Sequence, residues 1–274
     1  MLEDKYETQK HAHATARILL GVKKQKFKVW TLRIGILALL FAFWELFTTV
    51  GIMDSFFTSS PSRIIKTSFY LFHSGEIWKH LFVTTNECLI ALILSLVIGF
   101  VFAVLLWWNT TARKVGEPYL VVLNALPKIA LGPIIIIWFG ANEKSIVAMG
   151  FLICIVVTII NFLGAFISVD EDKIFLLRSM GANKFQILIK LVIPHSVPSI
   201  IDTVKIVVGL SWVGVIMGEY LVSGAGLGYL IIYGGQVFKI DLVMASTAVL
   251  CILATIMYAV VAFVGKLLRR YCVS

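Results

Sequence analysis

Residues 81–107 read LFVTTNECLIALILSLVIGFVFAVLLW, a segment that is almost entirely apolar. A helix rises about 1.5 Å per residue, and the hydrocarbon layer of a bilayer is about 30 Å thick. About 20 consecutive apolar residues are therefore enough to cross a membrane as a helix. The segment meets this requirement and predicts a transmembrane helix.

The rest of the chain has the same character. It is 59% hydrophobic and 14% charged, with a mean hydropathy of +0.95, whereas an average soluble domain is about 45–50% apolar and about a quarter charged. We therefore predict an all-α, polytopic membrane protein with about six transmembrane helices. The other five apolar runs are residues 30–50, 119–139, 146–167, 197–222 and 242–267. Pro127, Gly132 and Pro133 interrupt the third run of the six, so we expect a kinked or broken helix there.

Composition also excludes several kinds of site. The net charge of +9 does not indicate nucleic-acid binding, because the Lys and Arg residues lie between apolar runs instead of forming one polar face. The pair His11 and His13 has no further ligands nearby, so we predict no metal site. The cysteines are far apart and form no CxxC pair, and we interpret them as packing residues. They are Cys88, Cys154, Cys251 and Cys272.

The basic residues predict the orientation in the membrane. Most of the 24 Lys and Arg residues lie in the N-terminal tail, at residues 113–114, in the loop 168–196 and near the C-terminus. Positive residues are retained on the cytoplasmic side, so both termini are expected to be cytoplasmic in a cell (inner or plasma) membrane. The expected parts are a tail (1–29), a first transmembrane helix with an outer loop (30–80), a core of five transmembrane helices (81–267) and a short tail (268–274). The outer loops hold Arg63, Lys66, Lys79, Lys144 and Lys239.

The cytoplasmic loop 168–196 reads SVDEDKIFLLRSMGANKFQILIKLVIPHS. Asp170 and Glu171 suit a helix N-terminus, where negative charge is favoured. Gly181 permits a turn that a residue with a Cβ atom would resist. We predict two short amphipathic helices joined at Gly181, the second ended by Pro194 and Pro198. Their apolar stripe has no partner within the loop, so it either rests on lipid headgroups or docks a cytoplasmic protein.

Several motifs resemble those of the permease subunits of binding-protein-dependent ATP-binding-cassette importers. Gly181-Ala182 and Ile193-Pro194 match the cytoplasmic signature of that family at the expected spacing, although Phe175-Leu176-Leu177 replaces its Glu-Ala-Ala triplet. Four further stretches narrow the resemblance to the nitrate, sulfonate and taurine group. They are SSPS (59–62), ALPKIALGPIIIIWFG (125–140), Trp212 with Gly218-Glu219, and SGAGLGYL (223–230).

This resemblance implies a type I importer permease fold and a chain that catalyses no reaction itself. It also implies a permease homodimer, a cytoplasmic ATPase subunit that binds ATP and Mg, and an extracytoplasmic substrate-binding protein. In agreement, the chain has no GxxxxGK[ST] motif. The residues expected to couple to the ATPase are Phe175, Leu176, Leu177, Arg178, Gly181, Ala182, Phe185 and Pro194. A small anion such as nitrate, a sulfonate or taurine is favoured as the substrate, while a pyrimidine or flavin vitamin precursor stays open.

Three residues are candidates for the translocation pathway. Lys128 lies within an apolar run, where a cation is costly unless it faces the protein interior or water; alternatively, the neighbouring Pro127 places it where its stem snorkels to an interface. Glu219 and Trp212 lie on the fifth span at positions that match the family, which favours a gate or a pore lining. On the same helix, Asp202 and Lys205 are spaced to form a local ion pair.

Gly209, Gly214 and Gly218 put small residues along one side of the fifth span, which favours close helix packing.

Two other classes of protein compete with the permease. A secondary transporter driven by an ion gradient would need paired acids or histidines in its spans and inverted repeats, and a membrane enzyme would need a catalytic grouping such as HExxH or GxSxG. Neither pattern is evident in the sequence.

Overall fold

A computed structural model describes residues 25, 28–52, 54–222 and 224–272 of the chain. The predictions that concern the N-terminal tail, His11, His13, Ser223 and Ser274 lie outside the described residues, as does the side chain of Cys272. Every regular element in the described part is helical, which confirms the all-α class.

The elements follow one another along the chain with short connections. A first helix spans Lys28–Thr49. The others are α2 (Ser55–Thr58), α3 (Pro61–Ser74), α4 (Glu76–Trp108), α5 (Thr110–Ala125), η1 (Lys128–Leu131), α6 (Gly132–Phe139), α7 (Glu143–Ile167), α8 (Glu171–Ser179), α9 (Lys184–Ile187), η2 (Leu188–Val192), α10 (Ile193–Val222), α11 (Leu227–Gln236) and α12 (Ile240–Cys272).

Among the described residues, five helices are long and apolar enough to cross a membrane, and the count becomes six if a bent pair counts as one span. The bent pair consists of residues 110–125 and 128–139, and the helix axis bends by 83° between them. Leu126 has an extended backbone (ψ 138°), as expected for a residue that precedes a proline. The predicted break in the third apolar run is therefore confirmed, and its cause is Pro127.

The chain forms two compact units, residues 1–65 and 66–274. Within the first unit, Glu45 on the Lys28–Thr49 helix caps the beginning of α3. Its carboxylate accepts hydrogen bonds from the Ser62 backbone N–H at 3.0 Å and from the Ser62 hydroxyl at 2.7 Å. A negative group at a helix N-terminus is favourable, so this acid has a structural role inside an apolar segment.

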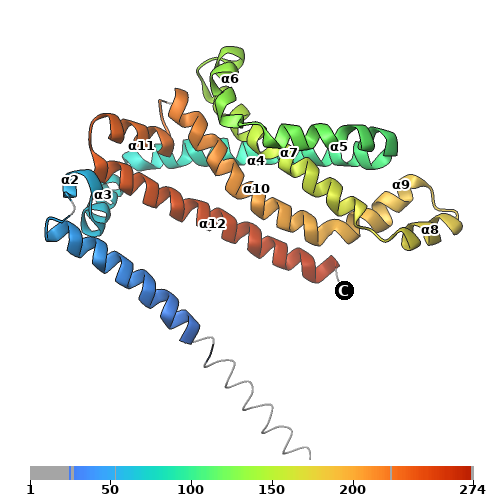
Figure 1. Ribbon diagram of the computed structural model, residues 1–274, viewed down its shortest axis with the longest axis horizontal. Helices are drawn as coiled ribbons and strands as arrows, with labels where there is room; N and C mark the ends of the chain where they lie inside the picture. The colour runs from blue at the N-terminus through green and yellow to red at the C-terminus, as the bar shows by residue number, and fades with distance from the viewer. Residues whose placement is uncertain (1–24, 26–27, 53, 223, 273–274) are drawn as a thin grey trace, which may run out of the picture. The chain divides into compact units, whose positions relative to one another are not determined.

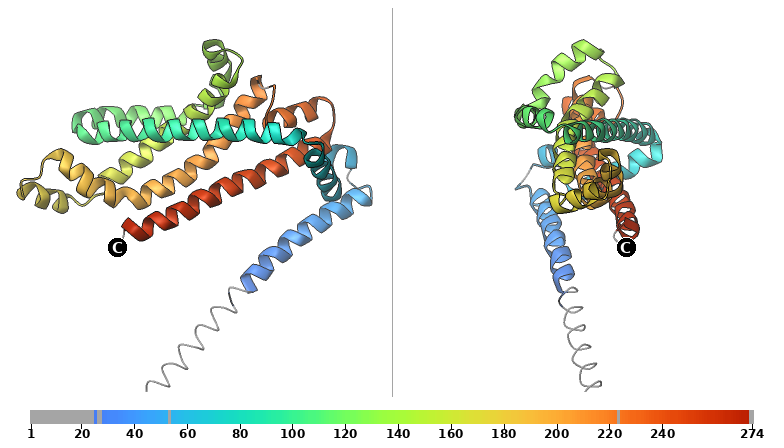
Figure 2. Two further views of the ribbon diagram at one scale, coloured as in Figure 1. Left: turned by 180° about the vertical axis from the view of Figure 1, so that it is seen from behind. Right: turned by 90° about the vertical axis from the view of Figure 1, so that its right-hand side faces the viewer.

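The second unit is built around α4, α7 and α10, which pack side by side with α12 (Figures 1 and 2). Gly214 and Gly218 lie where α10 crosses α7. A Cβ atom on Gly214 would come within 2.6 Å of the Gly150 Cα atom, and one on Gly218 within 2.8 Å of the Ile146 Cα atom. Close packing is confirmed at these two positions, but Gly209 has nothing within 4 Å of such an atom and takes no part in it.

Candidate functional site

The α8–α9 segment lies at one end of the second unit, and α11 lies at the other (Figure 1). Asp170 begins α8 by accepting the Asp172 N–H at 2.9 Å. The helix ends at Ser179, and Gly181, two residues later, has a φ of +86°, which belongs to the left-handed region. The Gly181 N–H bonds to the Arg178 carbonyl and the Ala182 N–H to the Leu177 carbonyl, both at 3.0 Å. This pattern is a Schellman cap, for which glycine is the favoured residue.

The second helix of the segment begins with a capping box. Asn183 Oδ1 accepts the Gln186 N–H at 2.8 Å, and Gln186 Oε1 accepts the Asn183 N–H at 2.9 Å. The two reciprocal bonds satisfy backbone donors that the helix itself leaves free. The predicted turn at Gly181, between a short first helix and a second helix, is therefore confirmed.

The predicted end of the second helix is wrong. The Lys184–Val222 segment is continuous, and Pro194 and Pro198 lie inside α10 instead of terminating a helix. Between α9 and α10, residues 188–192 form a π-helical turn, in which the Ile193 N–H bonds to the Leu188 carbonyl. This wider turn comes directly before Pro194, where a regular helix would lack an N–H donor and would clash with the ring.

The coupling candidates divide between two faces of this segment. Leu177 and Ala182 pack against a buried cluster that includes Phe166, Ile187 and Val192. The remaining candidates are exposed, and the large apolar ones among them are Phe175 (70%), Leu176 (60%) and Phe185 (59%). The inner residues fix the segment to the helices, while the outer residues leave apolar surface uncovered.

Lys184 fastens this segment to α4. Its Nζ atom donates a hydrogen bond to the Trp108 carbonyl and lies 5.7 and 5.6 Å from the ring centroids of Trp107 and Trp108. A cation over an aromatic face is attracted by the ring quadrupole. The two tryptophans therefore hold the beginning of α9 as well as occupying the end of a membrane helix.

Lys128 lies in the turn between the arms of the bent pair. It is partly exposed, and its Nζ atom donates to Asn124 Oδ1 at 3.3 Å. The position is consistent with both alternatives considered from the sequence, because a bend can serve a polar route or allow the stem to snorkel. The pathway role of Lys128 stays a prediction.

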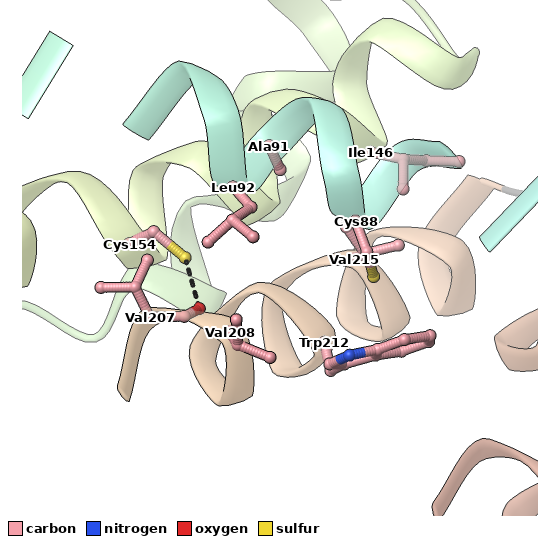
Figure 3. Close-up of a cluster of buried hydrophobic side chains, with 9 residues drawn as sticks. All are labelled: Cys88, Ala91, Leu92, Ile146, Cys154, Val207, Val208, Trp212 and Val215. Carbon is pink, nitrogen blue, oxygen red and sulfur yellow. Dashed lines mark hydrogen bonds between the residues drawn. The ribbon is translucent and has the colours of Figure 1, made fainter. Parts of the chain in front are cut away.

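Trp212 lies in the hydrophobic core and not on an open surface. Figure 3 shows its ring beside Val208, in a cluster contributed by α4, α7 and α10 that also contains Cys88 and Cys154. The side chain is 4% exposed, and its Nε1 atom has no hydrogen-bond partner among the described residues. Within this chain the residue packs helices together, and its role in the translocation pathway stays a prediction.

Glu219 is also inside the protein, with an exposure of 2%. Thr84 Oγ1 donates to its Oε1 atom at 2.6 Å, and the Gly228 N–H donates to its Oε2 atom at 2.5 Å. Thr84 in turn accepts the Leu227 N–H at 2.8 Å. The first N–H groups of a helix have no partners within it, so side chains from α4 and α10 cap α11. A role of Glu219 as a gate or a pore lining stays a prediction.

His80 and two glycines complete the cap of α11. The His80 Nδ1 atom accepts the Gly226 N–H at 2.9 Å, and its ring stacks on Tyr229 at 5.9 Å. Gly226 has a φ of +120°, and a Cβ atom on Gly228 would come within 2.7 Å of Glu219 Oε2. The glycines of the GAGLGYL stretch thus let the backbone approach the carboxylate closely.

The ion pair predicted between Asp202 and Lys205 on α10 is confirmed. Lys205 and Asp202 pair at 3.1 Å, and Arg269 from α12 joins them at 2.6 Å from Asp202. The sequence did not predict that Lys184 joins α9 to α4, or that His80 and Thr84 cap α11. Their partners lie more than 70 positions away along the chain, and no local pattern links them.

Comparison with known proteins places the chain in a family. Residues 95–273 match the family model described as "Binding-protein-dependent transport system inner membrane component". The taurine transport system permease protein TauC of Escherichia coli is 25% identical over 229 residues, covering 82% of this chain and 83% of its own. The formylaminopyrimidine transport permease protein ThiX of Halalkalibacterium halodurans is 31% identical (70% and 76%), and the riboflavin transport system permease protein RibX of Chloroflexus aurantiacus is 28% identical (86% and 88%).

Solved structures agree on the fold. The inward-facing MetNI methionine ABC transporter superposes with a TM-score of 0.61 at 16% identity, covering 73% of this chain and 97% of that one. A bacterial ABC transporter involved in the import of alginate gives 0.62 at 13% identity, with 89% and 98% covered. The type I importer permease fold is confirmed, and the chain belongs to the family of inner membrane permease subunits of binding-protein-dependent ABC importers.

Proposed function

We propose that this chain forms the route across the membrane for a small solute and is driven by a separate cytoplasmic ATPase that docks on the α8–α9 segment. An extracytoplasmic binding protein delivers the solute, and two copies of the chain enclose the route. ATP and Mg bind to the ATPase and not to this chain. Both termini face the cytoplasm in this arrangement.

The observation that carries this proposal is the rigid but uncovered α8–α9 segment. Its backbone is held by a Schellman cap, a capping box and Lys184, while Phe175, Leu176 and Phe185 stay exposed. Exposed apolar patches mark interaction sites on proteins, and a fixed backbone lets such a patch transmit force. Leu177 and Ala182 pack directly beneath, so a push on the segment reaches the core helices.

Site-directed cross-linking tests this docking. A cysteine at Phe175 should cross-link to the ATPase in the co-expressed complex, with a yield that changes when ATP and Mg are added. The matched control is a cysteine at Phe69, which is equally exposed (73%) but lies on α3. If the segment instead rests on lipid, a fluorophore at residue 175 will be quenched by lipid-borne quenchers and no cross-link to the ATPase will form.

For the substrate, we propose a small anion of the taurine or sulfonate type. The named relatives that support this choice include permeases for taurine and for aliphatic sulfonates, and Lys128 supplies a cation near the bend. Relatives named for formylaminopyrimidine and riboflavin keep vitamin precursors as the alternative. Uptake of labelled taurine, ethanesulfonate, formylaminopyrimidine and riboflavin by cells that lack their own systems separates the two classes.

A further inference from the structure

Two buried glutamates meet beside the cap of α11. Glu87 is 3% exposed and Glu219 is 2% exposed. Glu87 lies three positions after Thr84 on α4 and so shares its face, and the Thr84 hydroxyl contacts Glu219. Both carboxyl groups are therefore buried where α4 and α10 meet the beginning of α11.

Glu219 accepts hydrogen bonds from two nearby donors, whereas Glu87 accepts none from the described residues. The Thr84 hydroxyl donates a hydrogen bond to Oε1, and the Gly228 N–H donates one to Oε2. The nearby Cys88 thiol points away, toward the Ser211 carbonyl at 3.9 Å. Neither carboxylate oxygen of Glu87 accepts a hydrogen bond from any described residue.

An ionised Glu87 would therefore be a buried negative charge without a donor, next to a second negative charge. Burying an unpaired charge is energetically costly, and such a group normally becomes neutral instead. A proton on Glu87 removes this cost and turns the group into a donor. Glu219 keeps its charge because two donors already stabilise it, and each of its oxygens has a second lone pair to offer.

We propose that Glu87 and Glu219 form a proton-binding site, in which a neutral Glu87 donates a hydrogen bond to an ionised Glu219 and thereby holds the cap of α11 in place. Glu87 is thus a positioning residue for α11. Loss of the proton would put two negative charges together and push the Glu219 carboxylate out of the cap. The site is independent of the substrate that the chain carries.

The proton has a path to the surface at this end of the unit. Glu87 lines a cavity of about 580 Å³ whose walls include Val83, Asn142 and Val222. The titratable and charged groups that face the pair or this cavity come from four helices. They are Lys79, His80 and Cys88 on α4, Glu143 and Lys144 on α7, Tyr220 on α10 and Tyr229 on α11.

Infrared spectroscopy of the full chain in detergent tests for the proton. The wild-type spectrum should contain the C=O stretch of a neutral, buried carboxylic acid at neutral pH. Glu87→Gln should remove this band, while Glu143→Gln, an exposed acid that lines the same cavity, should keep it. An acid band that survives in Glu87→Gln, or that is absent from the wild type, overturns the proposal.

Hydrogen exchange of residues 226–236 tests the positioning role. An amide at residue 87 can donate to Glu219 as the neutral acid does, so Glu87→Gln should keep the wild-type protection of α11. Glu219→Gln should lower that protection by about tenfold, because it replaces a charged acceptor of the cap. Protection should fall at alkaline pH in the wild type but not in Glu87→Gln.

Equal loss of protection in the two Gln variants would overturn the proposal, as would a Glu87→Gln protein that aggregates while Glu143→Gln folds. Both readouts are independent of transport. A failure of the proposed function in uptake or cross-linking would therefore leave these results interpretable.

Discussion

The crossing of α7 and α10 gives a quantitative prediction. Gly214→Ala adds one methyl group where its carbon would lie 2.6 Å from the Gly150 Cα atom and 3.2 Å from both the Gly150 N and the Met149 O atoms. All three neighbours are backbone atoms, so no side chain can rotate away. The two helices must separate, and overpacking of this kind costs about 1–3 kcal/mol.

Gly209→Ala is the matched control on the same helix. A Cβ atom there has nothing within 4 Å. Both changes gain the same helix propensity, about 0.5–1 kcal/mol for glycine to alanine, which cancels in the comparison. The free energy of unfolding of Gly214→Ala should thus be about 1–3 kcal/mol lower than that of Gly209→Ala.

Equilibrium unfolding in mixed detergent micelles, followed by circular dichroism, measures this difference. The expected difference corresponds to a ratio of about 5 to 150 between the two unfolding constants. A difference below about 0.5 kcal/mol, which is ordinary for a surface substitution, would refute the assignment of Gly214 to a tight helix crossing.

Four further predictions concern transport, coupling and topology. Lys128→Met should reduce uptake by about tenfold, or about 1.4 kcal/mol, with unchanged membrane insertion; unaltered kinetics would favour the snorkelling interpretation. Gly181→Val should cost about 1–3 kcal/mol because φ is +86° and should weaken co-purification of the ATPase, whereas Gly181→Asn should be milder. Lys184→Met should speed amide exchange of residues 184–192 by about fivefold or more, since it removes the hydrogen bond that the charged Lys184 side chain donates to the Trp108 carbonyl, while Lys184→Arg should retain protection. In a background without the four native cysteines, Lys114→Cys should be labelled only from the cytoplasm and Lys239→Cys only from outside; the reverse result would contradict the predicted orientation.

Much of the candidate coupling element followed from local sequence. Asp170 and Asn183 are capping residues, and glycine is the residue that the left-handed conformation at position 181 favours. The turn was therefore predictable, because each of these features depends only on residues close by in the sequence. The error at Pro194 has a physical origin. Proline usually ends a helix, but a π turn before it removed the conflict, and no local pattern signals such a turn.

The sequence by itself determined the membrane class, the approximate number of spans, the break at Pro127 and the turn at Gly181. Hydropathy and local backbone preferences are properties of consecutive residues, so they can be predicted from the sequence alone. Only the tertiary structure decided that Trp212 lies in the core and that Glu219 meets Thr84, 135 positions away. In lipid both faces of a helix are apolar, so hydrophobicity does not specify helix rotation, and close packing and buried hydrogen bonds must do so.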